Sequence, residues 1–415
     1  MPRPPAVTHG RRHATVALAA AVALAACNPV APTVAPTPDP AGTARPAAEV
    51  YAEIRADVER ARGLQSTAAV DPVTIDEAQL VENLEAEFDA EYSVEELAFS
   101  EDSLTTLGLL PKGSSLKQLT LALQAGQVAG YYSPERDQLF VVRRSGTDLG
   151  AVERVTYAHE FTHQLQDQHF DLGHLFAGAE NETDGSYSRL ALVEGDAVSV
   201  QSAWMTERLT PQEMGELIAV ALGPTSIDAL QRAPRYLRET ALFPYEDGFA
   251  FASRLLAEGG SPAVDGAYAD PPTTTEQVLH PDRYLQREAA VEVSIPAGVA
   301  ASLGAGWSEG GQDTLGELVL RIWLREGGIT LPEARAATAG WGGDRLVLLR
   351  GPDDALAVGV ATVWDTPADA QEFGDAASAA ANALDLEVVV SRDDSLRVVI
   401  AIGPEADLLA AALGG

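Results

Sequence analysis

Apolar residues recur three and four positions apart through the first part of this chain, which is the spacing of one helix face. The pattern predicts helices over residues 50–64, 75–88, 93–107 and 116–124. Ser93 begins the third of these and Glu96 follows three positions later, as in a capping box. Many acidic residues stand between the apolar ones, so each helix is expected to keep one face in solvent.

Two short runs depart from this spacing. Residues 127–132 and 138–143 are rich in tyrosine, valine and phenylalanine, which favour strands, and the segment between them has turn composition. Together they predict a β-hairpin. Residues 151–168 contain neither proline nor glycine and return to helical spacing, so a helix is predicted directly after the hairpin.

The rest of the chain continues as helices and then changes character. Helices are predicted at 190–197, 211–222, 227–240, 244–259 and 314–326, and a strand is expected within 291–300. After the glycine-rich segment 340–343, runs with strand composition alternate with helical ones. The predicted strands are 345–349, 357–364, 387–390 and 396–402, and the predicted helices are 367–384 and 405–413. This order is typical of an α+β unit with a largely antiparallel sheet.

Composition narrows the classes of function. The chain has 415 residues, enough for two or three domains, and 46% of them are hydrophobic, as in ordinary globular proteins. The net charge of −33 would repel a phosphate backbone, so a nucleic-acid partner is not expected. Cys27 is the single cysteine, which excludes a disulfide within the chain.

The N-terminus has the charge and hydropathy of an export signal. Three arginines precede an apolar run, residues 14–26, that is too short to span a bilayer comfortably. The run ends in Leu-Ala-Ala-Cys27, which resembles the lipobox of bacterial lipoproteins. The resemblance implies that 1–26 is a lipoprotein signal peptide and that Cys27 is lipidated, which would anchor the protein to a bacterial membrane outside the cytoplasm. The alternative is an ordinary secretory signal cut nearby.

A tether follows the predicted lipidation site. Residues 27–48 are rich in proline, alanine and threonine and cannot build a core, so an extended segment is predicted there. It would hold the folded part away from the membrane surface. We divide the remainder into a domain at 49–310 and a C-terminal α+β subdomain at 311–415, for which no function is predicted.

His159, Glu160 and His163 form the pattern H-E-x-x-H inside the helix predicted at 151–168. Residues four apart lie on one helix face, so both imidazoles can turn a nitrogen to one metal ion. Glu160 lies at the rim of that face, within reach of a water molecule on the metal. This is the arrangement of zinc peptidases. The alternative is a buried helix with two hydrogen-bonded histidines.

A catalytic zinc ion needs a third protein ligand, and two candidates exist. His169 follows His163 at the spacing of the metzincins, but Gln166 stands where they have glycine. On a continuing helix His169 would point about 120° away. Glu194 lies in the apolar stretch 190–197, and a carboxylate in such surroundings needs a cation. Glu194 is therefore favoured, and a pairing with an arginine is its alternative role.

The H-E-x-x-H motif followed by Glu194-Gly195-x-Ala197 resembles the gluzincin class, in which a glutamate on a downstream helix completes the zinc site. Gly195 would let two helices approach closely. The resemblance implies one Zn²⁺ ion on the two histidines and Glu194. It also implies that Glu160 is the general base, which accepts a proton from water and passes it to the leaving amine of a peptide or protein substrate.

Three segments carry a narrower resemblance. Residues 130–132, 159–172 and 271–285 resemble a family of bacterial lipoprotein-type metallopeptidases. This resemblance spans about residues 125–290. It implies a zincin-like α+β domain, in which a small sheet and the active-site helix lie above a helical lower lobe.

Other residues are candidates for supporting roles. Asp167, Asp196 or backbone carbonyls could orient the histidines, and the sequence does not choose among them. His280 is the favoured donor to an oxyanion because prolines frame its loop, although a role in tying down that loop is the stronger interpretation. Tyrosines that could donate instead are Tyr157, Tyr245, Tyr268 and Tyr284.

We interpret the chain as a lipid-anchored zinc metallopeptidase. The predicted hairpin could add a peptide substrate to its edge as another strand, or could simply cover the core. One alternative function is a catalytically inactive lipoprotein that binds or assembles other proteins around a structural metal site. Another is a zinc hydrolase of non-peptide amides.

Overall fold

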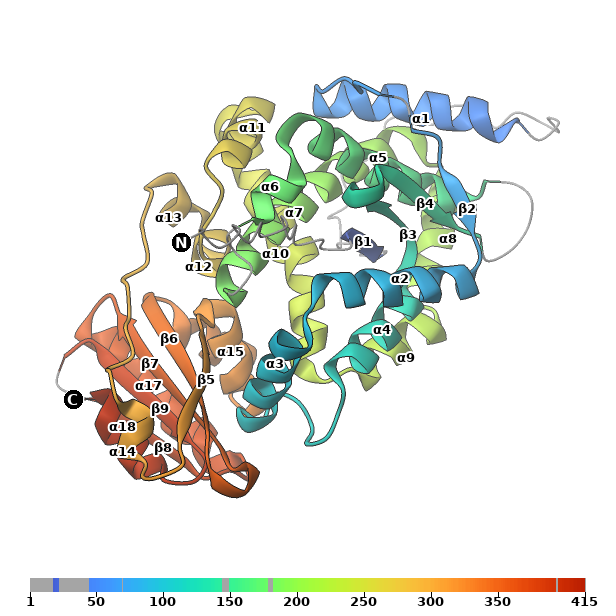
Figure 1. Cartoon of the computed structure of the whole chain (residues 1–415). Helices are drawn as coiled ribbons and strands as arrows, with labels where there is room; N and C mark the ends of the chain where they lie inside the picture. The colour runs from blue at the N-terminus through green and yellow to red at the C-terminus, as the bar shows by residue number, and fades with distance from the viewer. Residues whose placement is uncertain are drawn as a thin grey trace, which may run out of the picture.

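The computed structural model describes residues 18–21, 45–68, 70–143, 149–177, 182–392 and 395–414. Its class is α+β, as predicted, with helices around two separate sheets (Figure 1). Cys27 and most of the predicted signal peptide and tether lie outside the described residues. No helix in the described part of the chain has both the length and the apolar character needed to cross a membrane.

The first sheet has four strands in the order β1-β3-β4-β2. It confirms the predicted hairpin, since β3 and β4 are antiparallel and Tyr131 stands opposite Phe140. β2 pairs in parallel with β4. The sequence did not predict this strand, because three residues are too few to show an alternating pattern. The strands are Leu18–Ala21 (β1), Val73–Ile75 (β2), Val128–Ser133 (β3) and Gln138–Val142 (β4).

Helix α5 follows the hairpin and packs against it. It spans Ala151–Phe170 without interruption, which confirms the predicted helix. Tyr157, Phe161 and Leu165 on this helix are fully buried, in a core shared with β3, β4 and the first helix, α1. α1 runs along this core at the top of Figure 1. The helices of the N-terminal part are Ala47–Arg62 (α1), Glu77–Glu91 (α2), Val94–Thr106 (α3) and Leu116–Gln127 (α4).

Helices α7 (Thr183–Arg208) and α10 (Arg235–Gly259) cross at very short distance. A Cβ atom on Gly195 would lie 2.0 Å from the carbonyl oxygen of Gly248, and one on Gly248 would lie 2.4 Å from the carbonyl oxygen of Ala191. No side chain fits at either glycine. The structure thus confirms that Gly195 permits two helices to approach.

α10 corrects one predicted boundary. We expected helices at 227–240 and 244–259, but the break lies at 233–234 and the helix runs through Pro244. Proline costs about 3 kcal/mol inside a helix. The burial of neighbouring aromatic side chains such as Phe243 and Phe251 against α7 outweighs that cost. The neighbouring helices are Leu172–Phe176 (α6), Pro211–Ala221 (α8), Pro224–Arg232 (α9), Ser261–Ala269 (α11), Thr275–Leu279 (α12) and Pro281–Leu285 (α13).

The second sheet is antiparallel, in the order β5-β6-β7-β9-β8, and lies with its helices at one side of the molecule (Figure 1). Its strands are Ser308–Asp313 (β5), Trp341–Arg350 (β6), Leu356–Trp364 (β7), Val388–Arg392 (β8) and Arg397–Ile402 (β9). The helices are Val299–Ser302 (α14), Gly316–Glu326 (α15), Leu331–Thr338 (α16), Pro367–Ala383 (α17) and Ala406–Gly414 (α18).

Two features of this region differ from the prediction. The strand expected within 291–300 does not form, because Pro296 lacks a backbone donor and the segment turns into α14. β5 is an edge strand that was missed, since Ser-Glu-Gly-Gly-Gln-Asp contains no strand-forming residue.

A cluster of buried acids joins the second sheet to α7. Asp344 accepts hydrogen bonds from the backbone nitrogens of Leu315 and Gly316 at 2.9 and 2.8 Å. Asp184, in the first turn of α7, accepts from the backbone nitrogen of Thr275 at 2.8 Å. Gly316 has φ of +72°, and a Cβ atom there would lie 1.8 Å from Asp184 Oδ1. Burial raises the pKa of Asp184 to about 8.

This shift predicts how stability changes with pH. The ordinary pKa of the group is 3.8, so between about pH 4 and pH 8 the unfolded chain releases a proton that the folded chain retains. Each rise in pH through this window should favour unfolding. We expect the thermal midpoint to fall from pH 5 to pH 8, and to fall less in Asp184→Asn, as measured by circular dichroism. Asp407→Asn, at an exposed site, is the matched control. Equal slopes in all three proteins would contradict the prediction.

Candidate metal centre

α5 places the two histidines of the motif on the face turned toward α7. His159 and His163 are 1% and 0% exposed, and their Nε2 atoms lie 3.0 Å apart. Tyr157 and Phe161 occupy the other side of the helix, in the core beneath the first sheet. The amphipathic pattern of α5 therefore fixes which face carries the imidazoles.

Glu194 reaches the same point from α7. Its Oε2 atom lies 3.1 Å from His159 Nε2 and 3.4 Å from His163 Nε2, and its side chain is 1% exposed. The three ligand atoms form one of two groups among the described residues that could hold a metal ion. The structure thus brings together the three residues predicted as ligands.

The separations suit a small metal ion. Bonds of about 2.0–2.1 Å in a tetrahedral arrangement put neighbouring ligand atoms about 3.3–3.4 Å apart. The observed separations of 3.0, 3.1 and 3.4 Å are close to this spacing. Two imidazole nitrogens and one carboxylate oxygen also form the donor set that zinc accepts while it keeps an open position.

The electrostatics of the group favour a positive charge between the ligands. Burial alone would raise the pKa of Glu194. The attraction of His163 and hydrogen bonds from both histidines outweigh this effect and lower the pKa to about 2. Burial lowers the pKa of His163, yet the Glu194 carboxylate outweighs it and raises the value to about 9. Desolvation lowers the pKa of His159. The ionised carboxylate therefore attracts a cation, either a proton or a metal ion.

Glu160, the predicted general base, lies close to the two histidines. It is fully buried, and its carboxylate lies near enough to His163 to contribute to the raised pKa of that imidazole. The Glu160 side chain thus lies beside the ligands, on the same helix.

Tyr245 is the tyrosine that meets the metal group. Its hydroxyl donates to Glu194 Oε1 at 3.1 Å, and its ring centroid lies 6.2 Å from that of His159. The close crossing of α7 and α10 brings it there. Sequence reasoning counted Tyr245 only as one of several donors, because its position depends on this crossing.

His280, the favoured oxyanion donor, binds elsewhere. Its Nε2 atom lies 3.0 Å from Glu317 Oε2, and this pair joins the loop before α13 to α15. The hydrogen bond to Glu317 raises the pKa of His280. The contact agrees with the interpretation that His280 ties down its loop.

Gln166 is a site residue that sequence reasoning missed. Its Oε1 atom lies 2.8 Å from His163 Nδ1, so it contacts a candidate ligand directly. Asp196 contacts Gln166 rather than an imidazole, and Asp167 accepts from Tyr132 OH at 2.9 Å. The signal was available in the spacing, since residues three apart on a helix are neighbours.

His169 takes no part in the group. It lies exposed in the last turn of α5, where its Nε2 atom is 2.8 Å from the carbonyl oxygen of Gln65. The uninterrupted helix explains this, as the sequence predicted. The second acidic group, Glu276, Glu288 and Asp365, surrounds Arg283, which already supplies a positive charge.

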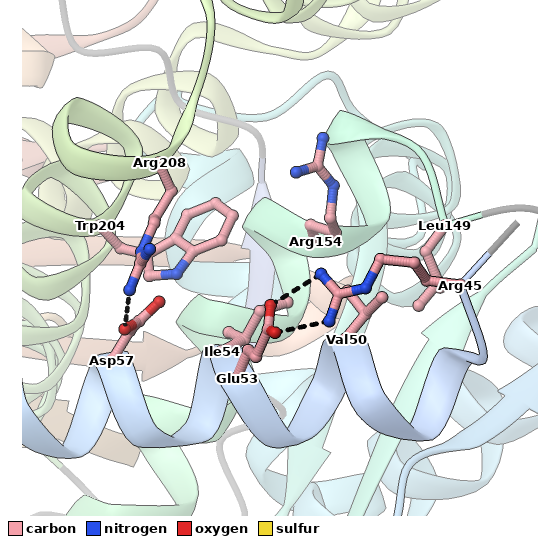
Figure 2. A pocket seen from close by; sticks show the side chains of 9 residues that line it. All are labelled: Arg45, Val50, Glu53, Ile54, Asp57, Leu149, Arg154, Trp204 and Arg208. Atoms are coloured by element: carbon pink, nitrogen blue, oxygen red, sulfur yellow. Dashed lines mark hydrogen bonds and ion pairs between the residues drawn. The ribbon is translucent and has the colours of Figure 1, made fainter. Parts of the chain in front are cut away.

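A pocket of about 380 Å³ lies away from the metal group, beside α1 and the end of α7 (Figure 2). Arg45 donates to both oxygens of Glu53, at 2.9 and 2.5 Å, and Arg208 pairs with Asp57. These cations are already balanced by neighbouring acids, and none of the candidate ligands lines the pocket.

The outer edge of β3 carries an added strand. β1 pairs with it in antiparallel orientation, with Leu18 opposite Tyr132 and Ala21 opposite Val128. β1 also packs against α5. An extended segment from a distant part of the chain thus lies along the sheet edge beside the helix that bears the histidines.

Comparison with known proteins covers only the C-terminal part. Residues 304–412 match a family described as "Domain of unknown function (DUF8575)". This segment holds the second sheet and does not include His159, His163 or Glu194. No curated protein and no solved structure matches the chain.

The geometry predicts the outcome of metal analysis. Wild-type protein dialysed against zinc should retain one ion, and Glu194→Ala should lose most of it because one of three ligands is gone. His169→Ala should retain zinc like the wild type. Zinc per chain, measured by plasma mass spectrometry, checks this. Full zinc retention by Glu194→Ala, or loss in His169→Ala, would contradict the ligand assignment.

Proposed function

We propose that this protein is a zinc-dependent peptidase of gluzincin type. One observation carries the proposal: a buried glutamate from α7 lies within 3.1 and 3.4 Å of the two histidines of an H-E-x-x-H helix. The donor set and its spacing support zinc. Glu160 next to the ligands supports hydrolysis, since a structural site needs no general base there.

A zinc ion at this site would supply a Lewis acid that activates water and polarises a carbonyl group. His159, His163 and Glu194 would hold it. Glu160 accepts the proton of the attacking water and returns it to the amine that leaves. Burial of these groups in a low dielectric strengthens each of these interactions.

Tyr245 has two roles open to it in this proposal. Its hydroxyl orients the Glu194 carboxylate through the 3.1 Å hydrogen bond. The same O–H group is the nearest tyrosine donor to the metal group among the described contacts, so it could also turn to the oxyanion of a substrate carbonyl. We assign both roles to Tyr245 in place of His280.

The proposed substrate is a peptide that binds along the edge of β3. The pairing of β1 with this edge supports the proposal, because the backbone of β3 there accepts an antiparallel strand. β1 lies within the predicted signal peptide 1–26, so removal of that peptide would leave the edge to a substrate. Main-chain hydrogen bonds would then supply affinity that depends little on sequence. The acidic surface, with a net charge of −33, disfavours nucleic acid as a partner.

We further propose that the enzyme works outside the cytoplasm, lipid-anchored through Cys27. The export signal and tether of the sequence support this location, and α1 begins at Ala47, close to the predicted end of the tether. The proposed division of the chain is a zincin-like domain at 49–310, with the α+β subdomain at 311–415.

The burial of the ligands also supports a second function, that of a binding or assembly factor with a structural metal site. All three are at most 1% exposed, which also suits a structural metal in a binding or assembly factor. Activity of Glu160 variants separates the two.

Glu160→Gln is predicted to retain zinc and lose turnover. The amide keeps the size of the side chain but cannot accept the proton, so kcat should fall by at least about 10²-fold. Cleavage of a quenched fluorescent peptide library and zinc content are measured on the same samples. Zinc loss in the variant would argue against Glu160 as base. A wild type that binds zinc and cleaves no peptide would favour the structural site.

Tyr245→Phe and His280→Ala are predicted to differ. Loss of the Tyr245 hydroxyl should reduce kcat by about 10-fold or more with little change in KM, because its interaction strengthens in the transition state. His280→Ala should keep wild-type kcat and lower the thermal midpoint, since it loses its contact with Glu317. The reverse pattern of kcat values would return the oxyanion role to His280.

A further inference from the structure

A buried chain of hydrogen bonds leads away from the metal group through Gln166. Its Nε2 atom donates to the carbonyl oxygen of Val193 and to Asp196 Oδ2, both at 3.0 Å. Its Oε1 atom faces His163 Nδ1 at 2.8 Å. Gln166 is fully buried and Asp196 is 2% exposed, so water does not compete for these bonds.

The partners fix the orientation of the Gln166 amide. A carbonyl and a carboxylate can only accept, so the amide atom between them must be the nitrogen. The oxygen is left for His163, and His163 Nδ1 must then carry the hydrogen and donate. When His163 is neutral, as a metal ligand must be, its lone pair then lies on Nε2, the atom that faces Glu194 and His159.

Asp196 in turn accepts hydrogen bonds from another part of the polypeptide. Arg62, the last residue of α1, donates its Nε–H to Asp196 at 2.9 Å and is itself 3% exposed. Arg62 also donates to Asp265 Oδ1 at 2.7 Å, and Tyr268 OH donates to Asp196 at 3.0 Å. A guanidinium stays charged at every accessible pH and can only donate. Arg62 therefore sets which group donates and which accepts in each of these hydrogen bonds.

We propose that Gln166 is a positioning residue that fixes the tautomer of His163 for metal binding, and that Arg62 and Asp196 hold it in this orientation. The proposal rests on the proposed zinc site. A glutamine is suited to this position because it turns its donor to Asp196 and its acceptor to the imidazole. A carboxylate at position 166 would face the Asp196 carboxylate and disturb the arrangement.

The first test compares two glutamines of the same helix. Gln166→Met keeps a similar volume and removes the hydrogen bonds, so the zinc dissociation constant should rise about 10–100-fold. Gln164→Met is the matched control: Gln164 is equally buried on α5, but it donates to the carbonyl oxygen of Ala68. The full-length variants are titrated with zinc against a fluorescent chelator, and apo-protein thermal unfolding checks that each is folded.

The second test exchanges the donor and the acceptor in the hydrogen bond between positions 166 and 196. Gln166→Glu alone should weaken zinc binding because two carboxylates meet. Adding Asp196→Asn should recover affinity, since the asparagine amide can donate to the carboxylate at 166 and its oxygen can accept from Arg62. A purely space-filling role for Gln166 predicts no such rescue.

Each result bears on the proposal. Weaker zinc binding in Gln166→Met but not in Gln164→Met, with rescue in the double variant, supports it. Wild-type zinc affinity in Gln166→Met, or a double variant no better than Gln166→Glu, overturns it. These measurements need no turnover, so a chain that binds zinc but cleaves no peptide refutes the proposed peptidase and leaves this test intact. A wild type that binds no zinc overturns both.

Discussion

The burial of one carboxylate constrains the rest of this structure. Glu194 is 1% exposed in the middle of α7, and an unpaired ionised group there would cost several kcal/mol. Two imidazoles from α5 and the Tyr245 hydroxyl from α10 surround it. These three helices can meet at one point only because α7 and α10 touch backbone to backbone at Gly195 and Gly248. The partners that stabilise the buried carboxylate can therefore reach it only if both glycines lack a side chain.

The sequence predicts well which three residues come together, because each lies in a local pattern. The H-E-x-x-H spacing on an amphipathic helix places His159 and His163 on one face, and the apolar surroundings of Glu194 mark it as a partner for a cation. The hairpin and the antiparallel C-terminal sheet also follow from composition and alternation. In each case neighbours along the chain determine the outcome.

What the sequence could not show depends on tertiary contacts. Tyr245 reaches Glu194 only through the crossing of α7 and α10, and α10 continues through Pro244 because packing outweighs a local penalty. Arg62 reaches Asp196 from 134 residues away. β5 pairs with β6 although its residues have little preference for a strand. Gln166 depends on both kinds of information. Its spacing from His163 was visible in the sequence, but its role also depends on the position of Asp196, which only the fold provides.

The matched C-terminal region has a structural connection to the metal group through α7. Thr183 and Asp184 open this helix and bond to Asp313 and Thr314, which lie within the matched residues. At the other end of α7, Arg208 pairs with Asp57 of α1. Glu194 lies between these two attachments, about 15 Å from Asp184 along the helix. A helix held at both ends cannot slide or rotate freely, so the C-terminal unit contributes to the position of Glu194 through its attachment to the start of α7.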